Sequence, residues 1–199
     1  MEMACDSNGI LRIPAEQRLN VFALVVYIPD PLGGFLDEMR RALVPGCNPH
    51  AHVSVLPPRP LAGDWQVARE QVRTLAEGWT PFDITLSNVA MFPVTNVIYI
   101  ELGQGAAEMY GLHSLMNTEA LRFAEPFEYH PHITVAQELP AESVGEIYGR
   151  AREMWDSYKG AKTFRAERAA FVQNTLGNCW IDLAEYSLGA TGDLVAGHR

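Results

Sequence analysis

Cysteine, basic residues and long apolar runs are all scarce in this 199-residue chain. Its three cysteines, Cys5, Cys47 and Cys179, are scattered and odd in number, which excludes a disulfide framework and indicates free thiols in a reducing compartment. No apolar run approaches the length of a membrane span, and the charges in residues 1–19 leave no room for the apolar core of a signal peptide. We therefore expect a cytoplasmic protein without a membrane segment.

The shortage of basic residues limits the partners that the protein can bind. The chain has 15 Lys and Arg against 24 Asp and Glu, which gives a formal net charge of −9. A long nucleic-acid footprint needs clustered Lys and Arg, so none is expected, whereas a small anionic ligand needs only a few donors. The hydrophobic content of 48% suffices for a sizeable core, and the length fits one domain, which we expect to be a monomer.

Apolar periodicity and turn residues divide the chain into strands and helices. Strands are expected at 21–28, 50–55, 82–92, 97–101, 129–135, 163–173 and 178–186, and helices at 30–43, 64–79, 105–122 and 141–157. Asp30 and Asp64 are placed to cap the first two helices. Pro57 and Pro58 are expected to end the second strand, because proline cannot donate to a ladder.

This order repeats itself: a βαβαβ unit occurs twice and is followed by one more strand. The repeat units cover about 20–92 and 97–186 and predict two similar lobes that face each other across a pseudo-twofold axis. We expect one two-lobed domain over 20–186, an irregular lead-in over 1–19 and a flexible tail over 187–199.

A short histidine pattern occupies the same place in both units. His50-Ala51-His52-Val53-Ser54-Val55 matches His130-Pro131-His132-Ile133-Thr134-Val135, and together they hold four of the six histidines. Side chains alternate along a strand, so His52 and Ser54 should share one face, as should His132 and Thr134. An imidazole beside a hydroxyl, present twice, could provide acid–base chemistry around a phosphate.

These paired motifs resemble the His-x-[Ser/Thr]-x signatures of the two-histidine (2H) phosphoesterases, and in particular the branch of bacterial 2′-5′ RNA ligases and cyclic phosphodiesterases. Pro29, the run Leu56-Pro57-Pro58 and Pro131 extend the resemblance, which covers roughly residues 20–186. It implies an α+β, LigT-like fold with two pseudo-symmetric lobes around a central groove, each lobe an antiparallel sheet with helices on the outside. It also implies hydrolysis of a 2′,3′-cyclic phosphate or a 2′-5′ phosphodiester in a small nucleotide or an RNA end, or the reverse ligation.

The residue types suit that chemistry. His52 and His132 can act as base and acid, because an imidazole exchanges protons near neutral pH. The hydroxyls of Ser54 and Thr134 can donate to the non-bridging oxygens of a phosphate. His50 and His130 are candidates for orienting the catalytic rings or lining the rim of the pocket. No metal and no cofactor is expected, and the residues do not indicate which histidine is the base.

Two alternatives stay open. In the first, the imidazoles of His50, His52, His130 and His132, with Cys47 nearby, bind a metal ion for a metal-dependent hydrolase. In the second, the protein binds a nucleotide without catalysis. Four aromatic residues near the expected strand ends could stack on a base, although core packing is the expected role for each: Tyr27, Phe92, Phe127 and Tyr129.

Overall fold

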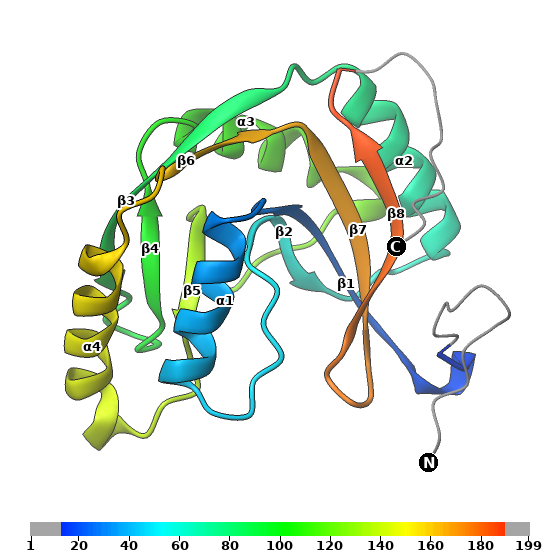
Figure 1. Ribbon diagram of the computed structural model, residues 1–199. Coiled ribbons are helices and arrows are strands. Elements are labelled where there is room, and N and C mark those ends of the chain that lie inside the picture. The colour runs from blue at the N-terminus through cyan, green and yellow to red at the C-terminus, as the bar shows by residue number, and fades with distance from the viewer. Residues whose placement is uncertain (1–12, 190–199) are drawn as a thin grey trace, which may run out of the picture.

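Two antiparallel sheets of four strands form the frame of the protein in the computed structural model, which describes residues 13–189 (Figure 1). The first sheet has the strand order β2-β1-β7-β8 and the second the order β5-β4-β3-β6. The strands are β1 (Arg18–Tyr27), β2 (His52–Arg59), β3 (Phe82–Met91), β4 (Ile98–Leu102), β5 (His132–Ala136), β6 (Thr163–Ala166), β7 (Arg168–Thr175) and β8 (Trp180–Ser187). The predicted α+β class with two antiparallel sheets is confirmed.

Four α-helices pack against these sheets within the described residues: α1 (Leu32–Leu43), α2 (Trp65–Glu77), α3 (Ala106–Met116) and α4 (Val144–Ser157). Three short 3-10 turns accompany them, η1 (Ala15–Gln17), η2 (Glu119–Leu121) and η3 (Ala141–Ser143). The Asp64 carboxylate accepts a hydrogen bond from Gln66 N–H at 3.0 Å and caps α2 as predicted, while Asp30 accepts one from Gly34 N–H at 2.8 Å. The apolar stripes of these helices face the sheets and form the core.

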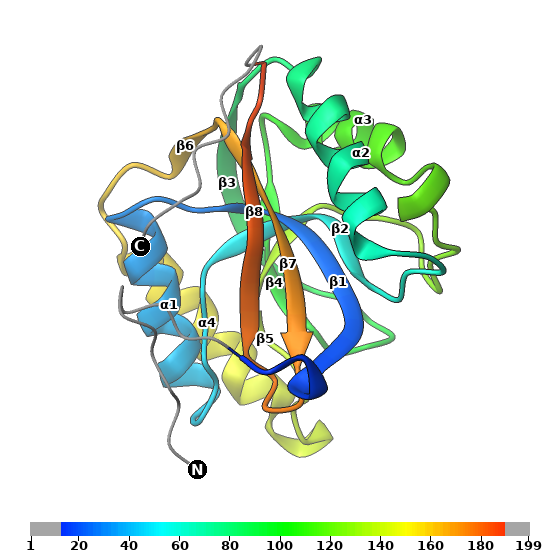
Figure 2. The same cartoon turned by 90° about the vertical axis from the view of Figure 1, so that its right-hand side faces the viewer.

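Each helix that precedes a histidine motif packs on the opposite sheet. Helix α1 lies between β1 and β2 in the sequence but contacts β5, and α3 lies between β4 and β5 but contacts β2. Figure 2 shows the outcome, with α1 and α4 on one side of the molecule and α2 and α3 on the other. The two halves of the chain are therefore interlocked.

The sheets also exchange strands between the two sequence units. Strand β3 of the first unit pairs with β4 of the second, and β7 pairs with β1. The sheets therefore do not coincide with the predicted units 20–92 and 97–186. The predicted lead-in and tail lie mostly outside the described residues, and the described part of the lead-in contains η1 and the start of β1.

Three predicted element boundaries are wrong for identifiable reasons. The strand expected over 163–173 is two strands, β6 and β7, because the buried face shifts by one residue at exposed Glu167 and Arg168, where the chain changes sheets. Strand β2 continues through both prolines, which its position at the edge of the sheet allows. Helix α3 ends at Met116, because the Asn117 side chain bonds both backbone groups of Phe123.

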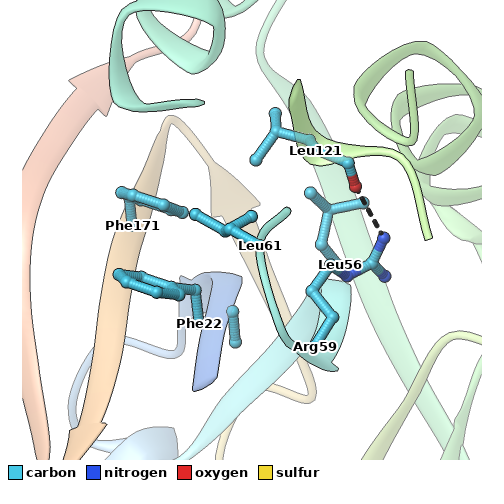
Figure 3. Close-up of a pocket in the computed structure, with 7 residues that line it drawn as sticks. Phe22, Leu56, Arg59, Leu61, Leu121 and Phe171 are labelled. Atoms are coloured by element: carbon cyan, nitrogen blue, oxygen red, sulfur yellow. Dashed lines mark hydrogen bonds between the residues drawn. The ribbon is translucent and has the colours of Figure 1, made fainter. Parts of the chain in front are cut away.

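The core contains one fully buried arginine at the end of β2. Arg59 is 2% exposed, forms an ion pair with Glu125, and donates to Asn117 Oδ1 at 2.9 Å and to the carbonyls of Pro57 and Leu121 at 2.9 and 3.3 Å. Figure 3 shows the bond to Leu121 beside a small packing void. That void is lined by Phe22, Ala23, Leu56, Arg59, Leu61, Leu121 and Phe171 and holds no motif histidine. Arg59 thus ties β2 to the segment that follows α3.

Replacing Arg59 with Met should destabilise the fold by about 3–5 kcal/mol, because Glu125 would stay buried without its partner. Equilibrium unfolding in urea measures the change. The matched control is Arg73→Met, since Arg73 pairs with Glu70 and Glu77 along the exposed face of α2 and should contribute little. Equal losses of unfolding free energy in the two variants would show that the buried ion pair of Arg59 contributes no more than the exposed ion pairs of Arg73.

Candidate active site

The two histidine motifs lie on neighbouring edge strands. Strand β2 ends the first sheet, β5 ends the second, and the two strands contact each other. His52 is the first residue of β2 and His132 the first of β5. Helix α1 packs on β5 and helix α3 on β2, so each motif strand is supported by a helix that precedes the other motif. Two motifs that are 80 positions apart in the sequence are thereby brought to one place.

Each motif histidine makes the same hydrogen bond. His52 Nδ1 lies 2.6 Å from the backbone carbonyl of His50, and His132 Nδ1 lies 2.6 Å from that of His130. A carbonyl oxygen only accepts, so we infer that each Nδ1 carries the proton and that each Nε2 of the neutral ring has a free lone pair. Among residues 13–189 neither Nε2 has a hydrogen-bond partner, so both atoms are available to accept or return a proton.

Both rings favour the neutral form. Burial lowers the pKa of His52 to about 4, the charges of Arg40, His50 and His132 lower it further, and the bond to the His50 carbonyl opposes the shift. Burial also lowers the pKa of His132, helped by His130 and opposed by the bond to the His130 carbonyl. His132 is one of the charges that lower the pKa of His52, and the strands that carry the two rings are in contact. An anionic ligand would favour protonation of either ring.

The hydroxyl groups of Ser54 and Thr134 make no hydrogen bond within the described residues, while their backbone carbonyls accept hydrogen bonds from other side chains. Within the described part of the chain neither Ser54 Oγ nor Thr134 Oγ1 has a hydrogen-bond partner, and both residues are half-buried. The Ser54 carbonyl accepts a hydrogen bond from the Tyr129 hydroxyl at 2.8 Å, and the Thr134 carbonyl accepts one from Arg40 Nη1 at 3.3 Å. The hydroxyls can therefore donate to a ligand from fixed positions.

The imidazoles of His50 and His130 each pack against an aromatic ring. His50 stacks on the Tyr27 ring at a centroid distance of 3.8 Å, and His130 meets the ring of Phe92 edge-on at 5.4 Å. Both are exposed, and it is their backbone carbonyls that hold the motif histidines. That their side chains orient the catalytic rings or line the rim of the pocket stays a prediction. Phe127, expected in the core, is 61% exposed.

Two site residues were missed by the sequence analysis. Arg40 and His113 are not among the predicted site residues. Each is the fourth residue from the end of its helix, and each bonds a strand carbonyl of the opposite motif: Arg40 that of Thr134, and His113 Nδ1 that of Val55 at 2.8 Å. The sequence gives no matching signal for the pair, because the helix of His113 was expected to continue to residue 122.

His113 belongs to a chain of contacts that ends at the first motif. Its ring stacks on Tyr129 at 3.8 Å, and its Nε2 lies 3.6 Å from Glu125 Oε1, the partner of Arg59. Burial raises the pKa of Tyr129, which keeps the hydroxyl protonated as a donor to Ser54. The segment that leads into the second motif is therefore fastened to the strand of the first.

Two further observations concern metals and membranes. Among residues 13–189 no three His, Cys, Asp or Glu side chains are arranged to hold a metal ion together, so the proposed four-histidine cluster is not formed. No helix in this part of the chain combines the length and apolarity needed to cross a membrane.

Comparison with known sequences supports the resemblance seen in the motifs. The sequence profile of the 2′-5′ RNA ligase superfamily matches residues 28–178, well over half of the chain and inclusive of both motifs. A Staphylococcus haemolyticus protein that carries a phosphoesterase name is 31% identical over 83 residues, which cover 41% of this chain and 48% of the relative. The chain thus spans about half the length of the curated relatives it matches first.

Solved structures share the fold at low sequence identity. E. coli LigT complexed with 3′-AMP matches 87% of this chain and 99% of its own, with 14% identity and a TM-score of 0.59. A protein of Thermus thermophilus matches 86% of this chain and 100% of its own, with 18% identity and a TM-score of 0.60. These likenesses confirm the LigT-like fold.

Nitrogen-15 NMR of the histidine rings tests the hydrogen-bond arrangement. Both motif rings should be Nδ1–H tautomers at neutral pH, with His52 titrating near pH 4 and His132 below the ordinary value of ~6.5. Between those pH values the unfolded chain binds more protons, so stability should fall as the pH drops, and His52→Ala should lessen the fall. An Nε2–H tautomer, or an ordinary pKa for His52, would contradict the arrangement.

Proposed function

Because the chain belongs to the 2′-5′ RNA ligase superfamily, we propose that it is a metal-independent phosphoesterase in which His52 and His132 act on one phosphate. The substrate in this proposal is a small nucleotide or RNA end with a 2′,3′-cyclic phosphate or a 2′-5′ phosphodiester. The observation that carries it is the matched pair of carbonyl-held histidines on adjoining edge strands. Each ring offers a free Nε2 next to a strand that carries a free hydroxyl.

The proposed reaction needs one neutral and one protonated imidazole. The neutral ring removes a proton from water as the water oxygen attacks phosphorus. The bond from phosphorus to the leaving ribose oxygen breaks, and the protonated ring gives its proton to that oxygen. Ser54 and Thr134 donate to the non-bridging oxygens, where negative charge grows in the transition state. With a ribose hydroxyl in place of water, the same two rings would catalyse the exchange in the ligation direction.

A small nucleotide substrate agrees with the charge of the chain and with ligands of a structural neighbour. The net charge of −9 disfavours a long nucleic-acid footprint. E. coli LigT has been crystallised with 3′-AMP, ATP, NADP⁺ and phosphate. Those ligands belong to LigT, and they motivate a panel of cyclic and 2′-5′-linked nucleotides, separated by chromatography after incubation, as the test of substrate identity for this chain.

Single substitutions test the roles of the two rings. His52→Ala and His132→Ala should each lower kcat by roughly 10²–10⁴-fold, and the double variant should be little worse, because loss of one ring disables the coupled proton transfer. The pH profile of kcat/KM should be bell-shaped. Ser54→Ala and Thr134→Ala should lower kcat on the order of 10²-fold or less. Near-full activity of either histidine variant on a hydrolysed substrate would reject the two-histidine mechanism.

Chelation separates this proposal from a metal-dependent hydrolase. Activity should survive dialysis against EDTA, because proton transfer and hydroxyl donors provide what a cation would otherwise supply. Metal analysis of the purified protein by mass spectrometry accompanies the assay. Turnover that is lost with EDTA and restored by added zinc would move the assignment to a metal site, and nucleotide binding without turnover of any panel member would favour a binding module.

A further inference from the structure

The equivalent helix residues Arg40 and His113 make the two halves of the site unequal. Both reach the strand carbonyls of the opposite motif, but His113 is stacked on Tyr129 and sits beside Glu125. The guanidinium group of Arg40 donates to the Thr134 carbonyl of the second motif. Its positive charge also lowers the pKa of His52 in the first motif. The helix α1 therefore brings a permanent positive charge to the motifs, whereas α3 brings the imidazole of His113.

We propose that Arg40 binds the phosphate of the substrate. This inference rests on the proposed function and adds to it a phosphate-binding residue. Figure 1 shows α1, which carries Arg40, beside β5, and the two elements are in contact.

The availability of the guanidinium group supports phosphate binding by Arg40. Arg40 is half-buried, and within residues 13–189 it has no carboxylate at ion-pair distance. Its side chain donates one hydrogen bond to the Thr134 carbonyl and interacts with Cys47, which leaves several of its five N–H donors available. Arg59 shows the opposite arrangement, because its guanidinium is paired with Glu125 and bonded to three further oxygens. An anion at Arg40 would offset the cost of a half-buried charge, and a guanidinium matches two phosphate oxygens at once.

The surrounding charges agree with this role. Burial lowers the pKa of Arg40, while Cys47, Asp37 and Glu138 oppose that shift, so the group stays cationic. The charge of Arg40 also lowers the pKa of His52, which agrees with a guanidinium group near both motifs.

Arg40→Gln and its neighbour Arg41→Gln form a matched pair, because both remove one charge from α1 and Arg41 is exposed. Calorimetric binding of inorganic phosphate should weaken by roughly 10–100-fold in Arg40→Gln and stay within about twofold in Arg41→Gln. Arg40→Lys should restore part of the affinity.

The outcomes separate this inference from the proposed function. Weakened phosphate binding in Arg40→Gln without turnover of any panel substrate by the parent protein would reject the function and keep the phosphate site. Turnover with unchanged phosphate affinity in Arg40→Gln would reject the phosphate site alone. No measurable phosphate binding by the parent protein, or equal effects in the two variants, overturns the inference.

Discussion

The crossed packing of α1 on β5 and of α3 on β2 is the constraint on which the rest of the structure depends. Each helix buries its apolar face on the sheet that holds the other motif, so neither half of the chain can form its core alone. Apolar burial of this kind is the largest favourable term in folding. It holds the edge strands β2 and β5 together, and the site exists only because these strands adjoin.

Backbone groups prepare the histidines for their proposed chemistry. The carbonyls of His50 and His130 hold the Nδ1–H groups of His52 and His132 and leave both Nε2 atoms free. Burial keeps the rings neutral until a ligand arrives. The two motifs differ in the side chain that donates to the strand carbonyl. Arg40 donates to the carbonyl of Thr134, and the Tyr129 hydroxyl donates to that of Ser54. A duplicated scaffold can thus hold a site with unequal halves.

The strands that carry the motifs and the start of α2 could be predicted from sequence, because local residue patterns determine them. Alternation identified the strands of His52 and His132, and Asp64 marked the start of α2. The exchange of strands between sheets was not predicted, because the shift at Glu167 and Arg168 is only one residue between two segments that each have a strand pattern. Arg40 was missed because a charged residue on an amphipathic helix is usually solvent-exposed, and only the tertiary contact with β5 buries it.

The central claim is that the Nε2 atoms of His52 and His132 act on one phosphorus atom from opposite sides. A crystal structure with a nucleoside 2′,3′-cyclic vanadate, whose five-coordinate vanadium imitates the transition state of the attack, tests it most directly. The account predicts that one Nε2 contacts the incoming apical oxygen and the other the leaving apical oxygen, each at a hydrogen-bond distance. A vanadate that contacts only one of the two rings, or that binds away from β2 and β5, would contradict it.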